Sequence, residues 1–179
     1  MAENERTRLR EREAPSLNAY EMGMARDRAW AERQQAGRIV VRLADTPQEL
    51  MRQGYLRYYL DSGRRVLDTP LQNWSVFTHE VRKVSGKHRH QGGLIIYVID
   101  GTGYSVVDGE RVDWEKGDLV LLPMKPGGVE HQHFNLDPTG KPALWMAFIH
   151  QGMREYLASE VQQTEPSPDW KAREDQAGR

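Results

Sequence analysis

Short apolar segments separated by turn residues fill the chain after Pro70. Asp100-Gly101 and Asp108-Gly109 are dipeptides typical of tight turns between antiparallel strands. Short strands at this spacing are typical of a sandwich or barrel. The pattern predicts strands at residues 74–84, 93–99, 103–107, 110–114, 119–122, 130–135 and 143–150.

A different pattern precedes these strands. Residues 16–36 are rich in good helix formers and contain no Pro, and Ser16 is a suitable N-cap, so we expect a helix there. The apolar run at 39–43 predicts a short strand. Residues 46–49 (TPQE) have capping-box spacing with Pro at the first helical position, which predicts a second helix over 47–60.

These elements predict one all-β domain with helices at both ends. Folding a chain of 179 residues removes roughly 70% of its unfolded surface from water, which is enough for a core without disulfides. We divide the chain into a charged, flexible N-terminus (1–15), a helical and strand extension that packs on the barrel (16–70), the barrel with a short closing helix over 153–162 (71–162) and a flexible C-terminal tail (163–179).

The charge balance argues against polyanionic partners. The 25 Lys and Arg residues face 26 Asp and Glu residues, for a formal net charge of −1, so no long-range field attracts phosphates. No run approaches the roughly 18 apolar residues of a membrane span, and the N-terminus lacks an apolar signal segment. We therefore expect a cytoplasmic protein that binds neither nucleic acid nor membrane.

Four of the six histidines form two His-x-His pairs, His88 with His90 and His131 with His133. The chain has no Cys, so a metal site must use His and carboxylate ligands. Residues i and i+2 of a strand point to the same face, so each pair presents two imidazoles on one side of a sheet. Two such pairs facing one lumen form a metal cage, whereas His79 is expected in the barrel wall.

The pattern around these pairs resembles the cupin superfamily. Its first motif runs through a Gly, an HxH pair, a Glu and a Gly, and its second through a Gly and a Pro to a His followed four residues later by Asn. Here the positions are Gly86, His88, His90, Leu94 and Gly101, then Gly117, Pro123, His131 and Asn135. The resemblance covers residues 74–150 and implies a double-stranded β-helix, or jelly-roll, barrel that binds a metal.

The motif's Glu is replaced by Leu94, which cannot bind a cation. The resemblance therefore implies metal ligands His88, His90 and His131, with His133 as either a fourth ligand or a pocket acid/base. Three neutral imidazoles leave a divalent ion its full formal charge, which favours an acidic or enolate substrate that chelates the ion.

Among cupins, the sequence looks most like gentisate 1,2-dioxygenases, which also carry HRH without the Glu. The turn at 101–103, the VDGE at 107–110 and Trp145 in the last strand match them. The resemblance implies an Fe(II) dioxygenase that cleaves a chelating aromatic hydroxy acid or diol with O2, since three histidines on an octahedral ion leave up to three positions open. For this chemistry the candidate residues are Arg82 as carboxylate anchor, with Lys83 as the alternative, Trp145 in the pocket and His133 as proton shuttle.

Other functions fit the same residues. The alternatives are a three-His cupin that cleaves a β-dicarbonyl or acts as an isomerase or lyase, and a non-catalytic metal-bound sensor of small molecules. Imidazoles also bind Ni, Cu, Zn and Mn, so these metals stay open beside iron. The apolar run at 94–99 fits a strand covered on both faces, which favours a homodimer or larger homo-oligomer.

Overall fold

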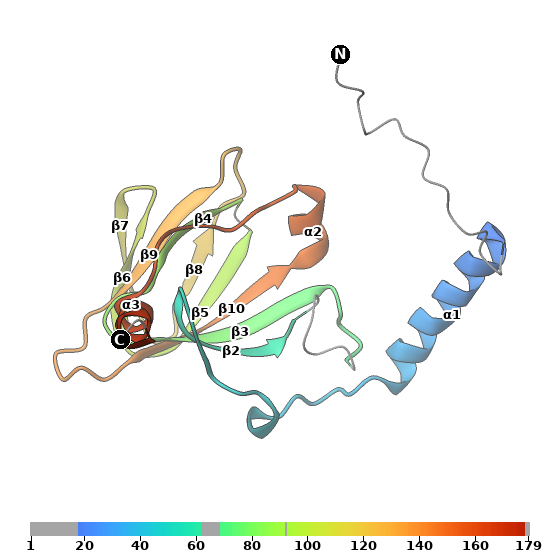
Figure 1. Cartoon of the computed structure of the whole chain (residues 1–179), viewed down its shortest axis with the longest axis horizontal. Helices are drawn as coiled ribbons and strands as arrows, with labels where there is room; N and C mark the ends of the chain where they lie inside the picture. Colours follow the sequence, from blue (N-terminus) through green and yellow to red (C-terminus); the bar gives the residue numbers. More distant parts are fainter. Residues whose placement is uncertain (1–17, 62–68, 92, 178–179) are drawn as a thin grey trace, which may run out of the picture.

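Two antiparallel sheets face each other in the structure, a computed structural model that describes residues 18–61, 69–91 and 93–177 (Figure 1). One sheet has the strand order β1-β2-β3-β10-β5-β8 and the other β11-β4-β9-β6-β7. The strands are β1 (Glu49–Met51), β2 (Gly54–Leu60), β3 (Trp74–Val81), β4 (Lys87–His90), β5 (Leu94–Asp100), β6 (Thr102–Val107), β7 (Glu110–Glu115), β8 (Leu119–Leu122), β9 (Val129–Asn135), β10 (Ala143–His150) and β11 (Gln162–Glu165). Each strand predicted after Pro70 is present, and the all-β class is confirmed.

The core lies in the lumen between the two sheets. Strand β10, which pairs with β3 on one side and β5 on the other, shows the alternation: Ala143, Trp145 and Ala147 are buried and the residues between them are not. Leu56 and Val98 add fully buried side chains from other strands, and each such side chain contributes roughly 1.5–3 kcal/mol. A one-residue slip would turn each inward set outward, so this burial fixes which side chains face the lumen.

The predicted helix over 47–60 is wrong, because this segment forms the hairpin of β1 and β2. Met51 pairs with Gly54 across the turn, and Gly54 has a φ of 135°, which a residue with a side chain adopts only under strain. The ring of Tyr58 packs against Phe77 with centroids 5.0 Å apart. Pairing of β2 with β3 thus overrides the local capping-box spacing, as tertiary context commonly does.

The predicted strand over 39–43 is also wrong. Ile39 and Val40 are exposed, and a 3₁₀ turn (Leu43–Asp45) follows them. A strand needs a hydrogen-bonded neighbour, and no described strand pairs with this run.

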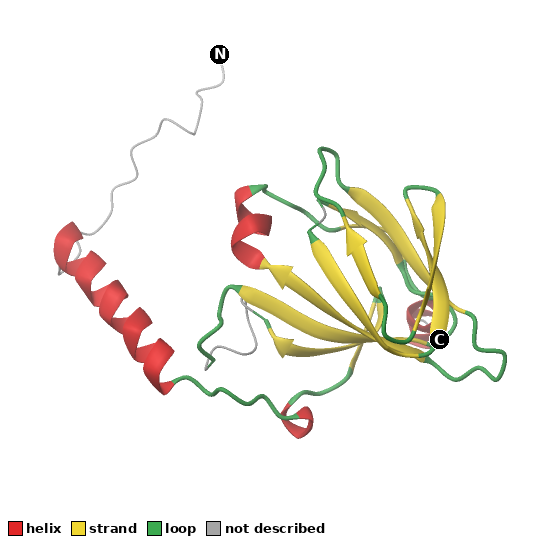
Figure 2. Cartoon of the chain, turned by 180° about the vertical axis from the view of Figure 1, so that it is seen from behind, coloured by secondary structure: helices red, strands yellow, loops and turns green. Residues whose placement is uncertain are grey.

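Helix α1 (Ala19–Ala36) begins later than predicted. Its N-cap is Asn18, whose side chain accepts the N–H of Glu21 while the Glu21 carboxylate accepts the N–H of Asn18. Ser16, the predicted cap, and the predicted flexible segment 1–15 lie outside the described residues. No residue of α1 is buried, and the helix stands apart from the sheets (Figure 2).

The C-terminal segment carries more regular structure than predicted. Helix α2 (Gln151–Tyr156) takes the place of the predicted closing helix over 153–162. Strand β11 pairs with β4, and helix α3 (Pro168–Ala177) packs near β1 and β2, where a flexible tail over 163–179 was predicted. None of the described helices is both long and apolar enough to cross a membrane.

Gly103 of β6 is directly opposite Trp114 of β7. A Cβ at this position would overlap the Trp114 ring and the carbonyl oxygen of Phe134. We expect Gly103→Ala to lower the free energy of unfolding by about 1–3 kcal/mol, the usual cost of overpacking, as measured by urea denaturation. The control is Gly23→Ala in α1, where no heavy atom lies within 4 Å of the added Cβ. Equal stability of the two variants would contradict the tight contact.

Candidate metal centre

Neighbouring strands bring three of the four paired histidines together. β4 and β9 pair in a register that places His88 directly opposite His131, and His90 lies on the same face as His88. Ring centroids are 4.2 Å apart for His88 and His131 and 4.9 Å apart for His90 and His131. One nitrogen from each ring lies within 4.8 Å of the others. This three-His cluster comprises the residues named as ligands from the sequence.

The hydrogen bonds of two rings leave their Nε2 atoms available to a metal. His88 Nδ1 lies 3.4 Å from the carbonyl oxygen of Gly86, and His131 Nδ1 lies 3.3 Å from that of Val129. A carbonyl oxygen only accepts, so each Nδ1 carries the hydrogen and each Nε2 keeps its lone pair. His131 Nε2 is buried without a hydrogen-bond partner among the described residues. A buried lone pair with no partner is what a bound cation would satisfy, so the site fits a divalent metal.

The protonation state of the three-His cluster also fits metal binding. Burial lowers the pKa of His88 and of His90 to about 4, and it lowers the pKa of His131 well below the usual 6.5. For His90 and His131, repulsion from neighbouring histidines lowers the pKa further. All three rings are therefore neutral at pH 7, which is the form that binds a metal.

No carboxylate joins the three-His cluster among the described residues. Leu94, at the position where the cupin motif has Glu, begins β5 in the opposite sheet and is buried in the hydrophobic core. A divalent ion at this site would keep its formal charge, as inferred from the sequence.

His133 lies beside the three-His cluster but outside it. Its ring centroid is 5.3 Å from that of His131, and its Nδ1 is 2.7 Å from Ser105 Oγ. Trp145 is buried between His133 and His79, with centroid distances of 5.0 and 4.7 Å. Burial lowers the pKa of His133 and takes that of His79 to about 3. The structure thus places His133 and Trp145 in the lumen together with His79, which the sequence analysis expected in the barrel wall.

Arg82 does not reach the three-His cluster, contrary to the expectation that it anchors a substrate there. His79 points into the lumen from β3, so Glu80 and Arg82 lie on the outer face of the sheet. The Arg82 guanidinium pairs with Glu80 at 2.9 Å and stacks over Tyr55, 3.7 Å from the ring centroid.

The structure brings a different cation, Arg154 of α2, close to the site. Its charge contributes to the lowered pKa of His90. Arg154 Nε donates to the carbonyl of Ser159 at 3.4 Å, and Ser159 Oγ accepts the N–H of Gln91, the residue after His90. A cavity of about 210 Å³ opens at the rim beside His90 and Gln91, and Arg154 is not among the residues that line it. Sequence reasoning missed Arg154 because no local motif marks it.

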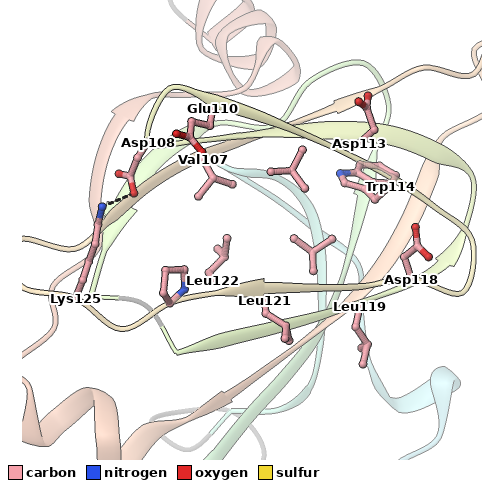
Figure 3. A pocket seen from close by; sticks show the side chains of 13 residues that line it. Val107, Asp108, Glu110, Asp113, Trp114, Asp118, Leu119, Leu121, Leu122 and Lys125 are labelled. Atoms are coloured by element: carbon pink, nitrogen blue, oxygen red, sulfur yellow. Dashed lines mark ion pairs between the residues drawn. The ribbon is translucent and has the colours of Figure 1, made fainter.

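A separate cleft of about 600 Å³ opens between β7 and β8, the edge strands of the two sheets (Figure 3). Lys125 pairs with Asp108 at 2.6 Å on its wall. Trp114 also lines this cleft, and its indole N–H points to Ser105 in the lumen. The three-His cluster takes no part in the cleft, so the cleft and the metal site are distinct.

The family comparison agrees with this geometry. The family model described as "Cupin domain" matches residues 75–149, which run from β3 through both His-x-His pairs to β10. The chain carries a cupin domain. The cupin fold expected from the two motifs is therefore confirmed, including the barrel of two antiparallel sheets.

Known relatives of the cupin domain include dioxygenases. A gentisate 1,2-dioxygenase of Streptomyces sp is 36% identical over 66 residues, which is 36% of this chain and 17% of that protein. An acireductone dioxygenase of Phaeosphaeria nodorum is 33% identical over 69 residues, 36% of this chain and 38% of that protein. The first match confirms the resemblance to gentisate dioxygenases, and the chain spans less than half the length of either relative.

A solved structure shows the same fold. The salicylate 1,2-dioxygenase of Pseudoaminobacter salicylatoxidans, in an adduct with gentisate, superposes with a TM-score of 0.51 at 17% identity, covering 79% of this chain and 36% of that one.

Proposed function

We propose that the protein is an Fe(II)-dependent dioxygenase that uses O2 to cleave an aromatic hydroxy acid or diol able to chelate the metal. The observation that carries the proposal is the three-His cluster with a buried, unpartnered Nε2 and no carboxylate. The local identity to gentisate 1,2-dioxygenase supports this chemistry over the alternatives.

Each group of the site has a separate task. His88, His90 and His131 hold the iron, which when bound supplies redox chemistry and open positions for a chelating substrate and O2. Trp145 and His133 present buried ring nitrogens without partners, Nε1 and Nε2, to the substrate. The apolar core side chains that pack beside these groups limit the access of bulk water to them.

Arg154 is our candidate anchor for a substrate carboxylate. Hydrogen bonding to the carbonyl of Ser159 occupies its Nε, and the two terminal nitrogens have no carboxylate partner among the described residues. A guanidinium offers paired donors that match a carboxylate. A carboxylate at the rim beside His90 then leaves the hydroxyl of the same substrate free to reach the metal.

Oxygen uptake tests the proposed reaction. We expect anaerobically iron-loaded protein to consume O2 with hydroxybenzoates or catechols, and β-diketones serve as the competing substrate class. Uptake with diketones alone would favour β-dicarbonyl cleavage. Absence of uptake with every class would contradict the proposal and favour Lewis-acid or sensor functions.

The role of Arg154 is tested with Arg154→Gln. We expect kcat/KM for a hydroxybenzoate to fall by about 10–100-fold, the loss of a hydrogen-bonded charge, while that for a catechol stays unchanged. Arg82→Gln is the matched control, because it removes the same charge from the outer face of β3. Equal effects of both variants, or of Arg154→Gln on both substrates, would contradict the anchor.

We also expect a homodimer. The outer face of β5 and β8 exposes Ile95, Tyr97, Leu119 and Leu121, each more than 40% accessible, and exposed apolar clusters of this kind commonly mark protein interfaces. We expect sedimentation of the wild type as a dimer and of Leu119→Lys/Leu121→Lys as a monomer. A monomeric wild type at micromolar concentration would contradict this interface.

A further inference from the structure

A chain of buried hydrogen bonds runs from Trp114 to His133. Trp114 Nε1–H donates to Ser105 Oγ at 2.9 Å, and the same oxygen lies 2.7 Å from His133 Nδ1. Ser105 is fully buried, and less than 5% of Trp114 and of His133 is accessible. Among the described residues, the hydroxyl of Ser105 has these two partners.

Sheet register explains why the three side chains meet. Ser105 on β6 is directly opposite His133 on β9. On its other side, β6 pairs with β7 so that Gly103 is opposite Trp114. Because Gly103 has no side chain, the indole lies across it and reaches Ser105, its diagonal neighbour. This chain of hydrogen bonds through Trp114, Ser105 and His133, called the relay below, therefore follows from the register of three adjacent strands.

The donors and acceptors of the relay favour one arrangement, the one that leaves fewer buried hydrogens without a partner. An indole N–H can only donate, and a hydroxyl has a single hydrogen to give. If His133 Nδ1 carried the hydrogen, Ser105 would accept twice and its own hydrogen would be buried without a partner. If Ser105 donates to a bare Nδ1, both hydrogen bonds are made and the ring hydrogen of neutral His133 is on Nε2, which has no partner among the described residues in either tautomer.

We propose that Ser105 and Trp114 are positioning residues that hold neutral His133 in the tautomer with its hydrogen on Nε2. A nitrogen that carries a hydrogen has no lone pair to give a metal, so His133 is a donor to the substrate and not a fourth ligand. Trp145 Nε1–H is also buried without a partner, and its ring contacts that of His133. Two neutral donors suit a carbonyl or enolate oxygen. This substrate assignment rests on the proposed function, whereas the tautomer does not.

Imidazole nitrogen NMR of the full-length protein tests the tautomer. We expect long-range proton–nitrogen spectra to show a protonated Nε2 and a bare Nδ1 for His133, with a tautomer ratio of about ten to one or more, given the cost of an unsatisfied buried hydroxyl. Adding Zn(II) should shift Nε2 of His88 and His131 and one ring nitrogen of His90, and it should leave Nε2 of His133 protonated. A protonated Nδ1 in the wild type, or Zn(II) bound by His133 Nε2, would overturn the proposal.

Two serine variants separate positioning from general packing. Ser105→Ala removes the donor to Nδ1, so the Nδ1 resonance should move to that of a ring without this bond, and Ser105→Thr should restore it. Ser85→Ala is the matched control. Ser85 is also buried, and its Oγ accepts the backbone N–H of His133 at 2.8 Å but makes no hydrogen bond to the His133 ring. Equal shifts in Ser85→Ala and Ser105→Ala would overturn the proposal. None of these spectra needs a substrate, so a failed oxygen-uptake assay would count against the proposed function alone.

Discussion

His131→Gln should bind Fe(II) or Zn(II) at least about 100-fold more weakly than the wild type. The ring centroid of His131 lies 4.2 Å from that of His88 and 4.9 Å from that of His90, closer than the 5.6 Å between His88 and His90. Loss of an outer-sphere partner alone commonly costs 10–100-fold in metal affinity, and loss of a ligand costs more. Gln keeps much of the side-chain volume, so the fold should persist in circular dichroism. Titration calorimetry and elemental analysis after dialysis measure the effect.

His150→Gln is the control for this metal prediction. His150 is exposed at the end of β10, where its Nδ1 accepts the N–H of Met153 at the start of α2. The variant should keep the full metal content of the wild type. His133→Ala should also keep it, because His133 lies outside the cluster. Full occupancy in His131→Gln would show that the ligands are assigned wrongly.

The sequence predicted the barrel well because its signals are local. Strands after Pro70 are bounded by turns such as Asp108-Gly109, where Asp108 and Gly109 both have positive φ. The residues next to each strand therefore predict where it ends. The shared orientation of the two histidines in each His-x-His pair was also predictable from local sequence, since residues i and i+2 share a face in any strand. That the two pairs lie close together in space was inferred from the order of the cupin motifs, because the sequence spacing between the pairs does not predict it.

Features that depend on pairing between distant segments were predicted poorly. The segment 47–60 has helix-like capping residues, and only its partner β3 makes it a strand. Arg82 was misplaced because the inward face of β3 becomes known only once His79 is seen in the lumen. Arg154 comes within range of His90 through a tertiary link, the Ser159 hydroxyl on Gln91, which leaves no trace in local sequence.

Acid should unfold the metal-free protein well above the pH at which its carboxylates titrate. Burial lowers the pKa of His79 to about 3 and those of His88 and His90 to about 4, against about 6.5 in an unfolded chain. Below pH 6.5 the unfolded state therefore binds protons that the folded state does not. Stability is complete above pH 6.5 and falls as the pH drops toward 4, by about 1.4 kcal/mol per pH unit for each histidine.

At pH 5 the low pKa values of His79, His88 and His90 together lower the free energy of unfolding by about 6 kcal/mol. This is a large share of the 5–15 kcal/mol by which a typical domain is stable. Urea denaturation of metal-free protein at pH 7.5, 6 and 5 measures this loss. His79→Gln cannot take up the proton, so its stability should depend on pH less steeply, by about 1.4 kcal/mol per unit. Saturating Zn(II) should raise stability at pH 7.5, because the metal binds the folded state alone. Metal-free wild type with equal stability at pH 7.5 and 5 would contradict a lumen of buried, neutral imidazoles.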